Sequence, residues 1–108
     1  MFVAMNRFSV VPGKEPAFEA LWLGRQTHLE QVPGFLAFHL MRGPSHDGES
    51  VYLSHTAWRG RADFEAWTRS EAFREAHRDR WDSAGLYLGK PKLELFDAIQ
   101  EVLPARAA

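Results

Sequence analysis

The chain has 108 residues, of which 45% are hydrophobic and 13% aromatic, and its formal net charge is −1 at pH 7. This length fits one domain, so we expect a single domain over residues 1–108, with a core over residues 2–102 and a tail over residues 103–108. A near-neutral charge without a basic block argues against nucleic-acid binding. The sequence contains no cysteine, which excludes disulfides, thiolate catalysis and cysteine-ligated metals.

The first residues, MFVAMNRFSV, lack the charged start and the cleavage site of a signal peptide. No apolar run in the chain reaches the length of a transmembrane helix. From these two features we expect a cytoplasmic protein.

Hydrophobic periodicity and turn residues predict six elements. In chain order they are a strand over Phe2–Val11, a helix over Glu15–Val32, strands over Phe35–Arg42 and Val51–Trp58, a helical stretch over Arg61–Asp82 that splits near Ser70, and a strand over Lys92–Val102. The order β-α-β-β-α-β is typical of the ferredoxin-like α+β fold, in which a four-stranded antiparallel sheet carries both helices on one face. We therefore expect that fold.

The predicted strands are apolar on both sides, although helices can cover only one face of this sheet. The first strand presents Phe2, Ala4, Asn6, Phe8 and Val10 on one side and largely apolar residues on the other. The simplest cover for the second face is the sheet of another copy of the chain, so we expect a homodimer that associates through its sheet faces.

Three residue types stand out against this apolar background. Asn6 is an amide in an apolar strand, and it is either a core residue bonded to the backbone or a donor aimed into a pocket. Trp67 shares a helical face with Phe64 and is either core or a pocket wall. His77 follows Phe73 by four residues and precedes Trp81 by four, so it lies on an apolar stripe. It is either a satisfied core or rim histidine, or an iron ligand or general base.

Two further histidines, His39 and His55, fall on neighbouring strands of one predicted hairpin. We expect their side chains to approach each other. The histidines have neither the HxH nor the HxxxH spacing, which argues against a zinc site.

The residues in question also form a pattern over nearly the whole chain, from Phe2 to Val102. The pattern comprises Met5-Asn6-Arg7, Pro33-Gly34-Phe35, Thr56-Ala57-Trp58, Phe64-Glu65-Ala66-Trp67, Ser70, Phe73, Ala76-His77 and Leu95-Phe96. It resembles the antibiotic-biosynthesis-monooxygenase superfamily, and most closely the small haem-degrading monooxygenases of bacterial iron acquisition. The Pro-Gly-Phe and Phe-x-x-Trp elements are typical of the superfamily in general, whereas the combination of Asn, Trp and His points to the haem-degrading branch.

The resemblance implies a role for each residue of this combination. His77 would be the proximal ligand of the haem iron, Asn6 would hydrogen-bond toward the distal ligand, and Trp67 would press on the porphyrin and help to ruffle it. Phe73 would line the haem site with these three. The resemblance further implies a dimer whose sheets join into a barrel, and a reaction in which haem is both cofactor and substrate, with O2 and an external electron donor, that opens the ring and releases iron.

Two other functions remain open for the same pocket. One is a cofactor-independent monooxygenase of a polycyclic aromatic or quinol substrate, with Asn6 as polar anchor, Trp67 as wall and His77 as base. The other is a non-catalytic dimeric module that binds a small ligand.

Overall fold

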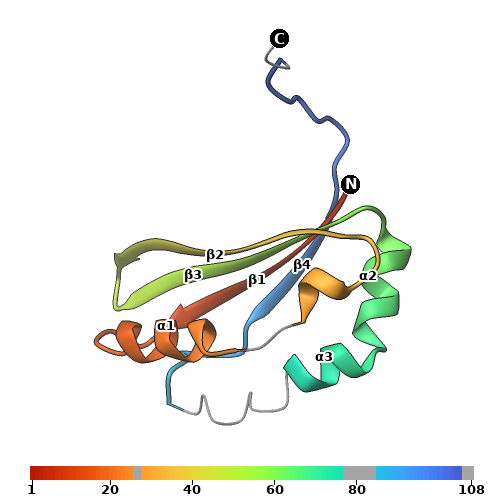
Figure 1. Ribbon diagram of the computed structural model, residues 1–108. Helices are drawn as coiled ribbons and strands as arrows, with labels where there is room; N and C mark the ends of the chain where they lie inside the picture. Colours follow the sequence, from red (N-terminus) through yellow and green to blue (C-terminus); the bar gives the residue numbers. More distant parts are fainter. Residues whose placement is uncertain (26–27, 77–84, 106–108) are drawn as a thin grey trace.

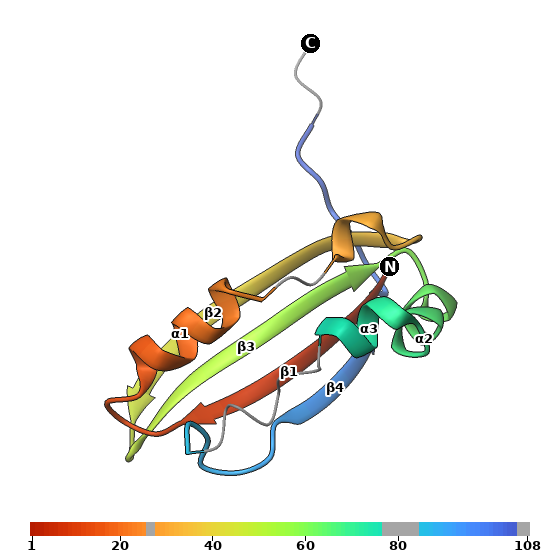
Figure 2. The same cartoon turned by 60° about the horizontal axis from the view of Figure 1, so that its bottom comes forward.

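A computed structural model describes residues 1–25, 28–76 and 85–105. The elements are β1 (Phe2–Val10), α1 (Glu15–Leu23), the 3₁₀ helix η1 (Leu29–Gln31), β2 (Phe35–His46), β3 (Glu49–Trp58), α2 (Arg61–Thr68), α3 (Glu71–Ala76) and β4 (Lys92–Asp97). All strand pairs are antiparallel, in the order β2-β3-β1-β4, and the helices lie on one face of the sheet (Figures 1 and 2). The predicted ferredoxin-like α+β fold is confirmed. None of the helices in this described part is long and apolar enough to cross a bilayer.

The pairing register decides which side chains share a face, because directly opposed residues of antiparallel strands point the same way. Phe2, Asn6 and Phe8 of β1 pair with Trp58, Ser54 and Tyr52 of β3. These six residues lie on the helix-covered face. The opposite face, called the outer face below, carries the alternate residues Val3, Met5, Arg7, Ala37, His39, Met41, Leu53, His55, Ala57, Glu94 and Phe96.

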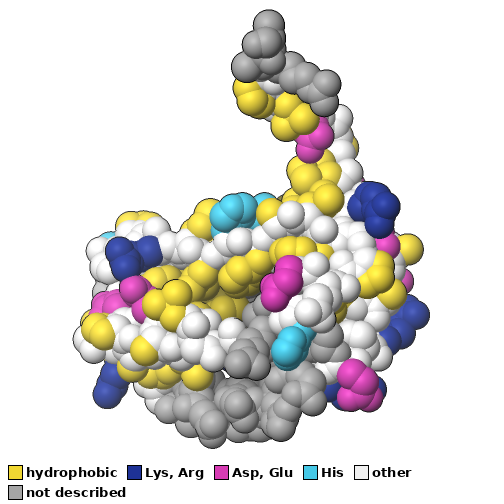
Figure 3. Space-filling view, viewed as in Figure 1, with side chains coloured by type: hydrophobic (Ala, Val, Ile, Leu, Met, Phe, Trp, Pro, Cys, Tyr) yellow, Lys and Arg dark blue, Asp and Glu magenta, His cyan; other side chains and the backbone are white. Residues whose placement is uncertain are grey.

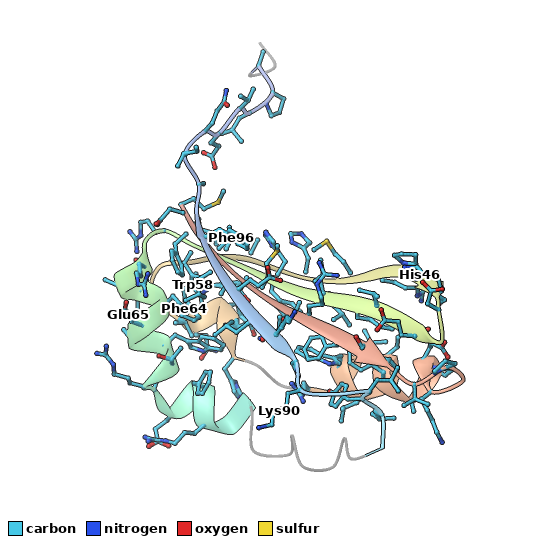
Figure 4. All side chains as sticks on the ribbon, turned by 180° about the vertical axis from the view of Figure 1, so that it is seen from behind. His46, Trp58, Phe64, Glu65, Lys90 and Phe96 are labelled. Carbon is cyan, nitrogen blue, oxygen red and sulfur yellow. The ribbon has the colours of Figure 1, made fainter. Side chains whose placement is uncertain are left out.

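Two aromatic clusters form the core on the helix-covered face. The Trp58 cluster contains Phe2, Ala4, Leu29, Trp58, Phe64 and Trp67, with Phe73 packed against it. The Phe18 cluster contains Phe8, Val10, Phe18 and Tyr52, with Trp22 and Tyr87 packed against it. Figure 4 shows Trp58 and Phe64 next to each other between α2 and the sheet, and their ring centroids are 6.1 Å apart.

The prediction of one helix over Glu15–Val32 is wrong. Helix α1 ends at Leu23, where the backbone N–H of Gly24 donates to the carbonyl of Ala20. His28 then takes a left-handed conformation at φ 57°, which a right-handed helix cannot accommodate. The break has a packing consequence, because Phe18 before it enters one cluster and Leu29 after it enters the other.

The split predicted near Ser70 is confirmed, and hydrogen bonds explain it. The Ser70 hydroxyl donates to the Trp67 carbonyl at 2.6 Å and accepts from the Phe73 N–H at 3.1 Å. One side chain therefore closes α2 and caps the start of α3, the typical use of serine at a helix N-terminus. The part of the predicted helical stretch from 77 to 82, with His77 and Trp81, lies outside the described residues.

The end of β2, the start of β3 and the end of β4 also differ from the prediction. The hairpin strands continue to a two-residue turn, Asp47-Gly48, whose positive φ angles of 50° and 76° fit a tight hairpin connection. Strand β4 ends at Asp97 instead of Val102, and its last link to the sheet is the bond from Ala98 N–H to the Met1 carbonyl at 2.8 Å. Residues 98–105 continue without further pairing to the described chain.

Candidate functional site

The candidate site lies between the two aromatic clusters, where the helix-covered face of the sheet is lined by polar residues. Along β1, Asn6 separates Ala4 of the Trp58 cluster from Phe8 of the Phe18 cluster. Directly opposite Asn6 on β3 is Ser54, and Leu93 of β4 faces Asn6 on the other side. An apolar core therefore carries a strip of hydrogen-bonding groups across its centre.

Asn6 is half-buried, and no hydrogen bond joins its side-chain amide to another residue of the described chain. A fully buried amide normally finds such partners within the fold, whereas a half-buried amide also reaches water. The structure therefore does not support the core interpretation, in which the Asn6 amide hydrogen-bonds to the backbone. An amide without a partner on the helix-covered face can donate to a ligand oxygen.

Ser54 and Thr56 extend the polar strip and were not predicted as site residues. Both are buried, with 4% and 7% of their surfaces exposed. The signal that could have found them is the strict alternation of β3, which puts Tyr52, Ser54, Thr56 and Trp58 on one face. Ser54 and Thr56 are thus small hydroxyl side chains that alternate with the large rings of Tyr52 and Trp58 on this face.

Trp67 belongs to the core and also borders open space. Its ring contacts Trp58, Phe64 and Phe73 at centroid distances of 5.3, 6.2 and 4.8 Å. Only 9% of its surface is exposed. The two interpretations of Trp67 are therefore compatible, because one side of the ring is packed while the residue also lines a cleft.

That cleft lies between η1 and α2 and has a volume of about 330 Å³. It is lined by His28, Gln31, Val32, Pro33, Asp63, Ala66, Trp67 and Ser70. Sites for small molecules usually measure about 300–1,000 Å³, so the cleft is at the lower end of that range. Asn6 is not among its lining residues, and the structure does not join the two into one cavity within the described part.

Phe73, predicted as a site residue, lies on α3 and meets Trp67 edge-on, at an interplanar angle of 87°. This contact holds α3 against α2. His77 itself, the predicted iron ligand, lies outside the described residues.

Trp22 of α1 provides the aromatic surface at the other side of the gap. Its ring stacks on Phe38 at 6.0 Å and 14°, and it meets Phe8 edge-on at 5.5 Å. The Trp22 Nε1 atom is buried and finds no hydrogen-bond partner within the described chain. The guanidinium of Arg25 lies 4.4 Å from the Trp22 ring centroid. The arginine therefore makes a cation–π contact with the face of the Trp22 ring.

Helix α1 is fixed to the β2–β3 hairpin by a polar network. Arg42 donates two hydrogen bonds to the Glu19 carboxylate, at 2.8 and 2.9 Å, and the Tyr52 hydroxyl donates to it at 2.5 Å. The bonds from Arg42 and Tyr52 hold the pKa of Glu19 below its ordinary value. A bond of 2.6 Å from the Ser50 hydroxyl likewise lowers the pKa of Glu15. Burial and the bond to Glu19 raise the pKa of Tyr52.

The histidine pair lies away from this site, on the outer face. His39 and His55 are directly opposed, with ring centroids 5.7 Å apart, which confirms that they approach each other. The Nδ1 atom of His55 is buried and has no hydrogen-bond partner in the described chain.

Comparison with known proteins places this geometry in a family. The family model described as antibiotic biosynthesis monooxygenase matches residues 1–79. The chain is 36% identical over 84 residues to a staphylobilin-producing heme oxygenase of Staphylococcus haemolyticus, covering 74% of this chain and 76% of that protein. It is 40% identical over 70 residues to a heme-degrading monooxygenase of Shouchella clausii, covering 64% of each.

A solved structure extends the likeness to the whole fold. The heme-degrader MhuD from Mycobacterium tuberculosis, with two hemes bound in its active site, superposes with a TM-score of 0.72 at 27% identity. The superposition covers 94% of this chain and 99% of that one. The predicted resemblance is confirmed, and the chain belongs to the antibiotic biosynthesis monooxygenase family.

Proposed function

We propose that this protein is a haem-degrading monooxygenase that binds haem in the gap between the sheet and the helices. The observation that carries the proposal is Asn6, whose amide has no partner in the described chain and lies on the helix-covered face between two aromatic clusters. Relatives of similar sequence are heme oxygenases and heme-degrading monooxygenases, which supports this substrate over other ligands of the family fold.

The described residues fit a flat, largely apolar group. Trp22 and Phe38 stack on one side of the gap, and Trp67 and Phe73 pack on the other. A neutral imidazole is the usual protein ligand of haem iron, so His77 is the residue that would hold the metal.

Bound haem would supply both the centre that activates O2 and the ring that is oxidised, with electrons from an external donor. The role of the chain is to position these partners. Asn6 would donate a hydrogen bond on the distal side, where negative charge develops. Trp67 would press on the ring from α2, because its other contacts in the Trp58 cluster leave it little freedom to move.

We also propose that the protein is a homodimer and that it is located in the cytoplasm. On the outer face, Met41 of β2 has 40% of its surface exposed and Phe96 of β4 has 47%. Leu36, also in β2, is 54% exposed. Apolar surface of this kind on a sheet without a helix layer favours burial against a second sheet. The dimer would bind one haem in each subunit.

A haem titration of the purified protein, followed by absorbance, tests the proposal. We expect a saturable Soret shift at one haem per chain, which His77→Ala abolishes and which His46→Ala, a change in the distant hairpin, leaves intact. Reductant and air should then bleach the Soret band. A titration without a Soret shift would contradict the proposal. It would favour the alternative, a cofactor-independent oxygenase of an aromatic substrate. O2 uptake with a quinol in the absence of metal would reveal that activity.

A further inference from the structure

We propose that His39 and His55 form a metal-binding site on the outer face, and that the ion it binds is copper(I). The site is separate from the proposed haem site, because the outer face and the helix-covered face are opposite sides of the sheet. Neither histidine has a part in the proposed reaction with haem. The proposal therefore does not depend on the proposed function.

The two histidines come from different strands, and the pairing register brings them together. His39 of β2 is directly opposite His55 of β3, with ring centroids 5.7 Å apart. Two imidazoles that bind one ion at about 2.1 Å have ring centroids about 5 Å apart at a tetrahedral angle, and about 6 Å apart on opposite sides of the ion. The observed separation lies between these values. The pair can therefore hold an ion without a movement of the strands.

One nitrogen of the pair is in need of a partner. The Nδ1 atom of His55 is buried, and no hydrogen-bonding group of the described chain reaches it. A buried polar atom left in this state costs about 1–3 kcal/mol. A bound ion would remove that cost, because a metal takes the lone pair of a neutral imidazole nitrogen.

The other member of the pair is open to the surroundings. His39 is exposed, so an ion can reach the pair from that side. Figure 3 shows histidine side chains, in cyan, at the surface on the side of the molecule away from the helices, next to hydrophobic side chains. The pair therefore combines a buried nitrogen with an accessible ring.

The surroundings of the pair favour a soft ion. Met5 of β1 is directly opposite His55 on its other side, and Met41 follows His39 by two residues on the same face. Directly opposed residues of antiparallel strands have Cβ atoms about 4.5–5.5 Å apart, so the Met5 side chain is long enough to bring its sulfur to an ion at His55. Imidazole suits copper and zinc alike, whereas a thioether ligand selects copper(I).

Hard ions find few ligands at this place. In the row of opposed residues that crosses the sheet here, the nearest carboxylate is Glu94 of β4, which Met5 separates from His55. The Glu94 Oε1 atom lies 3.9 Å from Arg7 Nε, so it already has a charged neighbour. Among the described residues, no group of three or more His, Asp or Glu side chains could hold a metal. Calcium and magnesium, which require several oxygen ligands, are therefore excluded as occupants of the pair.

Titration of the haem-free protein with copper(I) tests the proposal. The titration is done without oxygen against a coloured copper(I) chelator, and competition at equilibrium gives the dissociation constant. We expect His39→Asn and His55→Asn each to raise this constant at least about tenfold, since loss of even an indirect partner of a metal ligand costs about 10–100-fold. The control is His46→Asn, at the end of the same hairpin, which should change it less than about twofold. Circular dichroism confirms that the variants fold.

A second comparison tests the choice of ion. Met5→Leu should raise the dissociation constant of copper(I) and leave that of zinc within about twofold, because only copper(I) gains from the sulfur. X-ray absorption of the unmodified protein loaded with copper(I) gives a readout that no substitution can disturb, and we expect both nitrogen and sulfur neighbours of the ion.

Three results would overturn the proposal: no saturable binding of copper(I), an unchanged dissociation constant when both histidines are replaced, or an ion without sulfur neighbours. All these measurements are made without haem. A failure of the proposed enzyme activity would appear separately, in the haem titration.

Discussion

Gly34 lies just before β2 and packs closely against Asp63 of helix α2. Replacing Gly34 should therefore disturb the wall of the candidate site. Its φ of +82° is a conformation that residues with side chains rarely adopt. A Cβ atom at this position would lie 2.2 Å from Cγ and 2.5 Å from Cβ of Asp63, in the first turn of α2. The carbonyl of Gly34 also accepts a bond of 2.8 Å from the Arg59 N–H, which limits how far the backbone can retreat.

The cost of Gly34→Ala has two parts, and the chain contains a control that separates them. Holding alanine at positive φ costs about 1–2 kcal/mol. Forcing a methyl group into a filled space adds about 1–3 kcal/mol. Gly13 has a similar φ of +90°, but its Cβ would meet no atom within 4 Å. We therefore expect a loss of about 2–5 kcal/mol for Gly34→Ala and about 1–2 kcal/mol for Gly13→Ala.

Urea denaturation followed by circular dichroism measures both losses as changes in the free energy of unfolding. A second variant checks the source of the difference, because Gly34→Ala combined with Asp63→Gly removes the clashing atoms. This double variant should recover part of the loss, less the roughly 1 kcal/mol that glycine costs within a helix. Equal losses for Gly34→Ala and Gly13→Ala would refute the assignment of the clash to Asp63.

Three further predictions address the polar network, the floor of the gap and the packing of α3. Because the pKa of Glu19 is lowered in the folded state, its contribution to stability is present above pH 4.5 and is lost as the pH falls below that value. In Glu19→Gln, the free energy of unfolding should therefore fall less steeply with decreasing pH. An unchanged slope would contradict the role of the network. Asn6→Ala should slow haem degradation by about 10²–10³ while leaving the haem dissociation constant nearly unchanged. Ser9→Ala, on the outer face, should alter neither, and a loss of haem binding in Asn6→Ala would refute the donor role. Phe73→Ala should lower the free energy of unfolding by about 1–3 kcal/mol and expose the α2–α3 junction to protease.

Local signals explain which parts of the fold the sequence predicted. The alternation of β1 predicted that Phe2, Asn6 and Phe8 share one face of the strand, and the pairing register confirms it. Ser70 ended one helix and began the next through bonds to its immediate neighbours, so a short window contained the information. The order of elements then limited the topology to one common arrangement.

The missed features depend on contacts between distant parts of the chain. Helical periodicity continued across Gly24, although the structure breaks there because the apolar residues on either side enter different clusters. The network that fixes α1 joins Glu19 to Arg42 and Tyr52, which are 23 and 33 residues away. No local pattern in the sequence predicts such a pairing. The end of β4 at Asp97 likewise follows from where its partner β1 begins, because Phe2 is the last residue of β1 that pairs with it.

The candidate site combines one part that the register fixes and one part that packing fixes. The pairing of β1 with β3 runs without a bulge from Phe2–Trp58 to Val10–Ser50, whereas β2 carries two irregularities. A shift of the register by one residue would move Asn6 to the outer face. The pairing of β1 with β3 therefore fixes Asn6 on the helix-covered face. Trp67 has no such constraint, because α2 is located by side-chain contacts and by the close approach of Asp63 to Gly34. Substitutions that loosen α2 should therefore weaken the binding of a flat ligand. They should leave Asn6 in place, because the sheet and not α2 determines its position.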